Sequence, residues 1–415
     1  MNNYSNNRVK LYNEIPDNSL VVLYSGALKQ CSADENYPFK VNTNFYYLTG
    51  IDQDHAYLIA TKVRGEIEEH LFIYENDPIK VKWIGAYLYP NEASEISGID
   101  NIHFVKDFDE FLLKNVKRKG IKNVCLDLEK SGFDGQVDFG KVLKDKVNAY
   151  CFDKKIVNIY PTITLIRGVK EPWEIEIYQK AVDTTKLALE EVMKELPKLE
   201  YEYQVQGLFE YQIKKISNAG VSFETIAACG KNAAILHYRA NNESLEGKNM
   251  ILLDLGAEVG KYHADITRTY PIKGKYGELE RKIYESVLAC NKHIISIIKP
   301  GVTIMDLQKE TVSFLADECL KLGLIKEKEE IKNYYFHGIS HHIGLDTHDP
   351  HPRYAGTLVP GMIISVEPGL YFEELGIGVR IEDDILVSEE GCINLSKDII
   401  KEADEIEAFM AKYNN

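Results

Sequence analysis

The sequence lacks the marks of a disulfide-rich, zinc-ribbon or membrane-spanning protein. Its seven cysteines are scattered and form no CxxC pair, which indicates reduced thiols in a reducing compartment. No apolar run approaches the roughly 20 residues that span a bilayer, and the first seven residues are polar, unlike a secretory signal. We therefore expect a soluble, cytoplasmic protein.

Positive charge is also in deficit. Lys and Arg total 49 against 64 Asp and Glu, a formal net charge of -15. Nonspecific binding to nucleic acid or to anionic membranes needs basic patches, so we expect neither partner. A hydrophobic content of 45% is that of a globular protein, and a length of 415 residues suggests two domains.

The first roughly 150 residues alternate short apolar strands with helices, which favours an α/β domain. The predicted strands are 20–24, 45–48, 57–61, 71–74 and 124–128, and the predicted helices are 108–116 and 137–143. The pattern changes near Tyr160, without a Gly/Ser-rich linker. We place the boundary between 160 and 172, which divides the chain into domains 1–163 and 164–415.

The second half mixes longer helices with strands. Pro172 suits the first turn of a helix, and Gly220 suits the end of another. The predicted helices are 172–196, 202–218, 277–298 and 304–322, and the predicted strands are 251–255, 263–270, 362–366 and 379–386.

Five of the eleven histidines fall within residues 337–351: His337, His341, His342, His348 and His351. Histidine is the commonest metal ligand and the usual proton carrier near neutral pH. Packing alone explains such a cluster poorly. Its meaning depends on which carboxylates complete a site with it.

Four acids end or interrupt apolar strands in the same half of the chain: Asp254, Asp265, Glu367 and Glu382. An acid there is costly unless it is paired or binds a metal. Gly256 and Gly260 suit a hairpin or bulge that brings Asp254 and Asp265 side by side. Strand alternation puts Arg380 and Glu382 on one face, with Val379 and Ile381 on the other.

Each acid has an ordinary alternative explanation. A strand-end Asp254 is more often a cap or turn residue, Glu367 precedes a Pro-Gly turn, and Glu382 could pair with Arg380. Together, however, four buried acids would repel one another. Two divalent cations remove that repulsion, and oxygen-rich sites suit manganese, iron(II), cobalt or magnesium. The residues thus favour a dimetal hydrolase.

These motifs resemble the pita-bread metallopeptidases, family M24, over roughly residues 165 to 410. The matching segments are Asp254 and Asp265 with the following Thr267-Arg268-Thr269, then 337–341, 366–369 and 380–383. The family includes methionine aminopeptidase, aminopeptidase P, prolidase and creatinase. The resemblance implies an α+β chain, with a C-terminal pita-bread fold preceded by an α/β creatinase-type N-terminal domain.

The resemblance also implies a role for each ligand. Asp254 would chelate one metal, Asp265 and Glu382 would bridge both, and His341 and Glu367 would bind the other. Glu367 would also act as general base toward the bridging hydroxide. The cofactor would be two divalent ions, with manganese favoured.

Further roles follow from the same resemblance. His237 and His348 would contact substrate, His337 would line the leaving side, and Arg380 would brace the acids. We expect His263, His342 and His351 to be supporting or surface groups. The same expectation holds for Asp383 and Asp384, although either could orient Arg380.

The N-terminal half narrows the choice within the family. Residues 31–50 and, less specifically, 82–85 resemble the N-terminal domain of aminopeptidase P, which methionine aminopeptidase lacks. The resemblance implies release of the N-terminal residue from peptides with proline in the second position, by a homodimer or homotetramer. Alternatives are a prolidase that cleaves Xaa-Pro dipeptides and a noncatalytic protein-binding module. Creatinase is a weaker alternative because it dispenses with these ligands.

Overall fold

The computed structural model describes residues 3–128, 139–151, 153–351 and 356–413. The chain divides into two compact units, Met1–Arg167 and Gly168–Asn415. The helix α7 (Tyr160–Gly168) spans the region where the sequence pattern changes. Every helix among the described residues is too short or too polar to cross a membrane.

The first unit is built on a mixed sheet of strand order β4-β3-β2-β1-β5-β6. The strands are β1 (Ser19–Tyr24), β2 (Tyr57–Val63), β3 (Glu66–Ile73), β4 (Ile102–Phe104), β5 (Asn123–Leu126) and β6 (Lys155–Asn158). The strands β1, β5 and β6 run parallel, whereas β2 is antiparallel to β1 and β3. The core contains Val22 of the sheet and Leu112 and Leu143 of the helices. The helices are α1 (Tyr4–Glu14), α2 (Thr43–Thr49), α3 (Pro78–Ile84), α4 (Pro90–Ser97), α5 (Phe108–Val116) and α6 (Phe139–Tyr150).

The strand predicted at 45–48 is wrong, because these residues lie in the helix α2. The Asn42 side chain caps the helix by accepting a hydrogen bond from the Phe45 N–H at 2.8 Å, and Gly50 ends it at a φ of 71°. All residues from Asn44 to Thr49 are buried, so no polar face distinguishes helix from strand. The predicted helix 137–143 corresponds to α6, although residues 137 and 138 lie outside the described residues.

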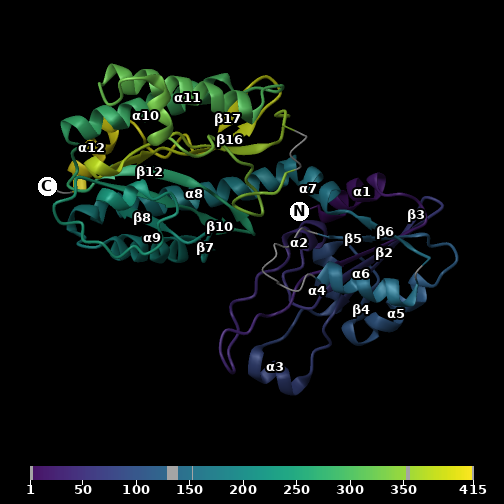
Figure 1. Cartoon of the computed structure of the whole chain (residues 1–415). Helices are drawn as coiled ribbons and strands as arrows, with labels where there is room; N and C mark the ends of the chain where they lie inside the picture. Colours follow the sequence, from purple (N-terminus) through teal and green to yellow (C-terminus); the bar gives the residue numbers. More distant parts are fainter. Residues whose placement is uncertain (1–2, 129–138, 152, 352–355, 414–415) are drawn as a thin grey trace. The chain divides into compact units, whose positions relative to one another are not determined.

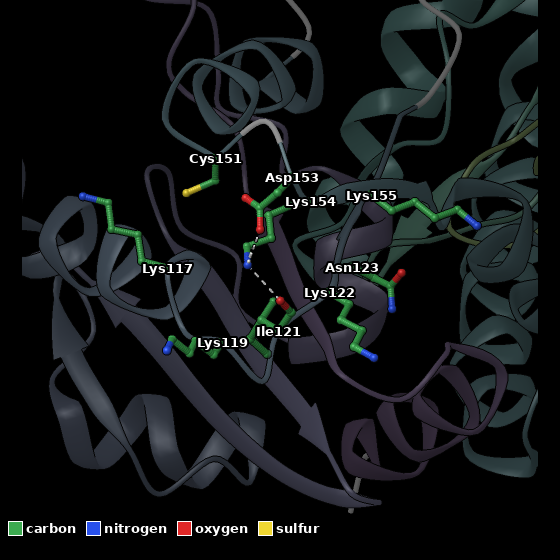
Figure 2. Close-up of a pocket in the computed structure, with 9 residues that line it drawn as sticks. All are labelled: Lys117, Lys119, Ile121, Lys122, Asn123, Cys151, Asp153, Lys154 and Lys155. Atoms are coloured by element: carbon green, nitrogen blue, oxygen red, sulfur yellow. Dashed lines mark hydrogen bonds and ion pairs between the residues drawn. The ribbon is translucent and has the colours of Figure 1, made fainter.

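A hollow of about 640 Å³ in this unit is lined by five lysines, despite the acidity of the chain (Figure 2). They are Lys117, Lys119, Lys122, Lys154 and Lys155. The helices α5 and α6 both end beside it, and the negative end of a helix dipole favours cations. Lys154 also closes an internal contact, since its Nζ donates to the Ile121 carbonyl at 3.0 Å and pairs with Asp153 at 3.2 Å. The hollow is thus a local concentration of positive charge in an acidic chain.

The second unit places small sheets between helices (Figure 1). The helices α10 (Glu278–Ile297) and α11 (Ile304–Lys321) lie on one side of the strands, and α8 (Pro172–Glu195) and α9 (Glu202–Ser217) lie on the other. All four were predicted to within one residue at each end. The last described helix is α12 (Ala403–Tyr413).

The strands of this unit form four sheets among the described residues, in the orders β11-β10-β7, β12-β9-β8, β13-β16-β17 and β14-β15. They are β7 (Gly220–Val221), β8 (Ile226–Cys229), β9 (Met250–Leu255), β10 (Ala257–Val259), β11 (Tyr262–His263), β12 (Ile266–Pro271), β13 (Ile363–Val366), β14 (Gly369–Phe372), β15 (Ile377–Arg380), β16 (Asp383–Val387) and β17 (Cys392–Asn394).

Two predicted strands, 263–270 and 379–386, are each broken at an acid. Asp265 lies between β11 and β12, and Glu382 lies between β15 and β16. The Asp265 N–H donates to Asp384 Oδ2 at 3.2 Å, and the Glu382 N–H donates to the Thr267 carbonyl at 3.0 Å. The predictions of unbroken strands were wrong because these contacts, made with residues far along the chain, leave no trace in the local alternation of apolar residues.

The predicted hairpin between Asp254 and Asp265 is confirmed by the pairing of β10 with β11. Gly260 and its neighbour Lys261 form the turn, both with positive φ. Gly256 allows a second close approach, because a Cβ there would lie 1.8 Å from the Ala264 carbonyl oxygen. The chain next to Asp265 therefore passes directly against the end of β9.

Candidate metal centre

Five side chains of the second unit converge on one centre, and they are the five predicted ligands. Asp254 comes from β9, Asp265 and Glu382 come from the two strand breaks, and Glu367 follows β13. Ligand atoms of Asp254, Asp265 and Glu382 lie within 4.8 Å of one another, as do those of His341, Glu367 and Glu382. Because Glu382 belongs to both groups, the groups form one continuous cluster.

Asp254 has one oxygen that is bonded and one that is not. Arg380 Nη2 donates to its Oδ2 at 2.6 Å. Its Oδ1 is buried without a hydrogen-bond partner among the described residues. A buried carboxylate oxygen without a partner is costly, and a divalent cation would satisfy it. This atom shows that the residues fit a bound metal.

Asp265 and Glu382 have strongly perturbed acidity. Burial raises the pKa of Asp265 well above its ordinary value, and the charge of Asp254 raises it further. Burial likewise raises the pKa of Glu382, followed by the charge of Asp265. Carboxylates this close repel one another when ionised. Two cations would offset the repulsion, and a donor set of four carboxylates and one imidazole suits hard or borderline divalent ions.

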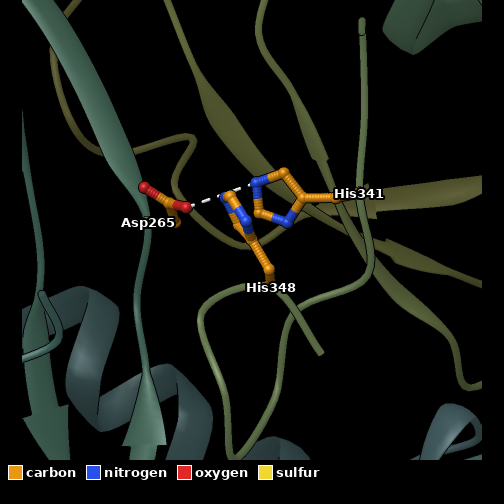
Figure 3. Close-up of side chains that lie close together, drawn as sticks. All are labelled: Asp265, His341 and His348. Atoms are coloured by element: carbon orange, nitrogen blue, oxygen red, sulfur yellow. Dashed lines mark ion pairs between the residues drawn. The ribbon is translucent and has the colours of Figure 1, made fainter. Parts of the chain in front are cut away.

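His341 presents one ring nitrogen to the carboxylates, as Figure 3 shows for Asp265. Its Nδ1 lies 3.1 Å from the His342 carbonyl oxygen, which can only accept, so Nδ1 carries the proton. Its Nε2 lies 3.4 Å from Asp265 Oδ2 and 3.6 Å from Glu367 Oε1. The fixed tautomer leaves the Nε2 lone pair free for a cation.

The cluster opens into a cavity of about 290 Å³ that is also lined by His237, His337 and His348. The ring of His348 lies 4.3 Å from that of His341 and 6.4 Å from that of His237. Figure 3 shows the His348 ring beside the contact between His341 and Asp265. The structure thus brings the three histidines expected on the substrate side to the same cavity as the ligands.

Two of these histidines are held neutral. Burial lowers the pKa of His337 to about 4, and the charge of Arg380 lowers it too. Burial, with the charge of His341, lowers the pKa of His348 to about 4. A neutral imidazole donates from one nitrogen and accepts at the other. His337 already uses both, since its Nδ1 donates to the Gly338 carbonyl at 2.8 Å and its Nε2 contacts the Tyr371 hydroxyl at 2.8 Å. Of the two rings, it is therefore His348 that can hydrogen-bond a polar substrate.

Tyr371 links the histidines to the acids. Its hydroxyl lies 2.8 Å from His337 Nε2 and accepts from Arg380 Nη1 at 3.0 Å. Arg380 Nε donates to Thr267 Oγ1 at 3.0 Å, and that hydroxyl donates to Glu382 at 2.7 Å. Sequence reasoning missed Tyr371 because no spacing marks one tyrosine in a buried strand. Thr267 belongs to the Thr267-Arg268-Thr269 motif, but the sequence alone indicated no role for it.

The remaining predicted residues lie away from the cavity lining. His342 is buried rather than at the surface, its ring stacks on His351 at 4.1 Å, and burial lowers its pKa to about 3. His263 Nδ1 lies 3.0 Å from Thr347 Oγ1. These contacts are those of supporting groups.

Asp383 and Asp384 bond elsewhere. Asp383 pairs with Arg268 at 2.8 Å and with Lys401, and Asp384 accepts from the Asp265 backbone. In the part of the chain that the structure describes, neither bonds to Arg380. The suggestion that they orient Arg380 is therefore wrong, since Asp254, Thr267 and Tyr371 hold its guanidinium.

Comparison with known proteins agrees with this geometry. Residues 176–389 match metallopeptidase family M24, and residues 4–125 match the N-terminal domain of aminopeptidase P. The chain belongs to family M24, in its aminopeptidase P group. The matched range 176–389 contains the five candidate ligands and the three cavity histidines. The pita-bread fold expected for the second unit is thereby confirmed.

Relatives resemble this M24 chain over nearly its whole length. An Xaa-Pro aminopeptidase from Haemophilus influenzae is 29% identical and covers 98% of this chain and 96% of its own. A Bacillus anthracis structure described as a candidate aminopeptidase P is 39% identical at a TM-score of 0.95, covering 99% and 98%. Zinc-substituted Escherichia coli aminopeptidase P in complex with product is 28% identical at a TM-score of 0.90, with the same coverage.

Proposed function

We propose that this M24 chain is a metal-dependent exopeptidase that releases the N-terminal residue from peptides with proline in the second position. The observation that carries the proposal is the buried ligand cluster, with its unpartnered Asp254 oxygen, at the floor of a histidine-lined cavity. Similarity to Xaa-Pro aminopeptidases over almost the whole chain supports the substrate class.

The five candidate ligands would hold two cations. Asp254 would serve one, His341 and Glu367 the other, and Asp265 and Glu382 both. When bound, the cations would polarise the scissile carbonyl and make water a nucleophile near neutral pH. We propose manganese from the oxygen-rich donor set, whereas the E. coli relative is described with zinc.

Glu367 is the proposed general base. The Ser365 hydroxyl donates to its Oε1 at 3.3 Å, and its Oε2 lies 3.8 Å from His337 Nδ1. Burial raises the pKa of Glu367, which moves this carboxylate toward the range useful for accepting and returning a proton. His348 and His237 would donate hydrogen bonds to the substrate, and His337 would line the leaving side.

Proline in the second position makes this substrate distinct. A Xaa-Pro amide has no N–H and carries a rigid ring, so peptidases that bind that N–H handle it poorly. A site that activates the carbonyl and binds the ring needs no such donor. The cavity, bounded by imidazoles and Leu236, is consistent with this requirement.

The test is metal removal followed by reconstitution. Metal-free enzyme should not cleave Xaa-Pro-Xaa peptides, and added Mn²⁺ should restore cleavage with two ions bound per chain. A chain that binds no metal and cleaves nothing after reconstitution would instead be a binding module. Cleavage of Gly-Pro but not of longer Xaa-Pro peptides would indicate a prolidase.

We also propose that the chain forms a homodimer or homotetramer. The helix α3 buries none of its own residues, and it exposes Ile79, Trp83 and Ile84, with Trp83 84% exposed. Apolar groups gathered this way favour an interface. Light scattering on wild type and Trp83→Lys should give a smaller particle for the variant.

A cytoplasmic location is proposed as well. All seven cysteines are free, six of them buried or partly buried, as in proteins of reducing compartments. Fractionation of the source cells would test the location.

A further inference from the structure

Glu202 is a buried carboxylate outside the metal centre. It is the first residue of α9, it is 0% exposed, and it does not line the cavity. Burying a carboxylate is costly unless hydrogen bonds compensate it. The positive end of a helix dipole favours a negative charge at this position. The identity of its hydrogen-bond donors indicates what the carboxylate does.

Among the described residues, four donors surround this carboxylate, and all four lie in one segment, 229–243. Oε1 accepts from the Cys229 N–H at 2.8 Å and from the Asn232 side chain at 3.3 Å. Oε2 accepts from the Tyr238 hydroxyl at 2.9 Å and from the Glu243 N–H at 2.9 Å. Glu202 therefore fastens both ends of a segment that leaves β8 and returns toward β9.

That segment carries His237 to the cavity. His237 is adjacent to Tyr238, which Glu202 holds directly. Tyr238 and Leu236, the residues on either side, pack with Ile226 and Tyr371 in one apolar cluster. His237 itself is exposed in the cavity, and its position therefore depends on its anchored neighbours.

We propose that Glu202 is a positioning residue that fixes His237 toward the substrate. This proposal rests on the proposed function, in which His237 contacts the substrate. Within the described part of the chain, Glu202 neither lines the cavity nor bonds to a candidate ligand, so its effect on turnover would pass through the 229–243 segment. A misplacement of about 1 Å can lower a rate by about 100-fold, which makes the effect measurable.

Glu202→Gln is the sharp test because it keeps the shape and changes the hydrogen bonding. One carboxylate oxygen becomes an NH₂ group, which faces two donors and can accept from neither. We expect kcat/KM for an Xaa-Pro peptide to fall about tenfold to 100-fold, while bound metal stays at the wild-type stoichiometry.

A double-mutant cycle with His237→Ala separates positioning from general damage. If Glu202 acts through His237, Glu202→Gln should change kcat/KM less than about twofold in the His237→Ala background. An equal loss in both backgrounds would overturn the proposal. If His237→Ala alone leaves kcat/KM unchanged, the proposed role of His237 fails instead, which is a different result.

A control and a second variant complete the experiment. Glu195→Gln removes a charge at the end of α8, where Glu195 pairs with Lys198 at 3.0 Å and not with the 229–243 segment among the described residues, and it should leave kcat/KM unchanged. Should Glu202→Gln not fold, Tyr238→Phe removes one donor and keeps the ring in the apolar cluster. It should lower kcat/KM several-fold, again only when His237 is present, and a loss independent of His237 would contradict the proposal.

Discussion

Glu382 and Asp383 are adjacent in the chain and both are buried, yet their surroundings are opposite. Glu382 lies among carboxylates, and burial followed by the charge of Asp265 raises its pKa. For Asp383, burial also favours the neutral form, but the charges of Arg268 and Lys401 outweigh it and lower the pKa of the carboxyl.

The two carboxylates differ in whether the protein itself supplies the compensating positive charge. We call Asp383 with Arg268 and Lys401 the ion-pair cluster, and Glu382 with the other candidate ligands the metal cluster. Asp383, with two cationic side chains and the Ser396 hydroxyl, is compensated within the protein and stabilises the fold. The cluster of Glu382 has too little positive charge of its own and is compensated only when cations bind. A buried acid in a strand therefore has no fixed meaning until its neighbours are known.

The largest expected effect comes from a substitution in the metal cluster. Asp265→Asn should lower kcat/KM by about 1,000-fold or more, because the metals supply several kcal/mol of transition-state stabilisation. It should also raise the thermal stability of metal-free protein, since a repelling charge is gone. Peptide kinetics and calorimetry after chelation test both effects. A metal-free variant less stable than the wild type would show that repulsion is not the dominant cost.

The next largest effect comes from a substitution in the ion-pair cluster. Asp383→Asn should lower the free energy of unfolding by about 3–5 kcal/mol, because it leaves buried Arg268 and Lys401 without their anion. Urea unfolding of metal-free protein measures this loss. Metal stoichiometry at low temperature should stay at the wild-type value. A loss of bound metal without a loss of stability would show that Asp383 supports metal binding rather than the fold.

The pH dependence of metal-free protein sharpens the contrast. Asp265 and Glu382 have folded pKa values above their unfolded values of about 3.9 and 4.3, and burial raises the pKa of Asp384 to about 7. Groups with raised pKa values cost stability once ionised, so metal-free stability should fall from about pH 4 to about pH 7.

Metal-loaded protein should lack most of that fall, because the cations compensate the ionised acids. The Tm difference between loaded and metal-free protein should therefore widen as pH rises. Thermal unfolding with and without chelator across this range measures the difference. A gap that stays constant with pH would rule out the acids as its source.

The smallest expected effect comes from Tyr371, which connects the histidines of the cavity to Arg380 and the acids. Tyr371→Phe removes the hydroxyl that contacts His337 and Arg380 and should lower kcat/KM about tenfold, as for other supporting groups of metal sites. Metal content and unfolding free energy should change little. Kinetics on the purified variant beside Tyr334→Phe, a tyrosine outside the cavity lining, provide the measurement and its control.

Much of the second unit followed from local signals. Pro172 opens α8, where the Glu171 N–H donates to the Glu174 side chain at 2.8 Å, and the other helices have equally local periodicity. That the five candidate ligands belong together could be predicted because the four acids stand out against apolar neighbours, His341 lies in a histidine cluster, and the motifs occur in a known order.

The rest depended on contacts between distant residues. The helix α2 is buried on all sides, so its helical period is invisible, and the strand breaks at Asp265 and Glu382 are held by residues over 100 positions away. Glu202 resembles any acid at a helix start, and only the fold reveals its four donors. Hydrogen bonds between residues far apart in the chain could not be predicted, because local sequence patterns do not indicate them.

Gly256 gives the ligand pair an unusual dependence on size. A Cβ at this position would lie 1.8 Å from the Ala264 carbonyl oxygen and 2.9 Å from the Ser222 hydroxyl. A single added carbon would push the Asp265 backbone away from Asp254, since it collides with rigid main chain rather than with a flexible side chain. A methyl group at position 256 would therefore increase the distance between Asp254 and Asp265, two of the carboxylates that would hold the cations.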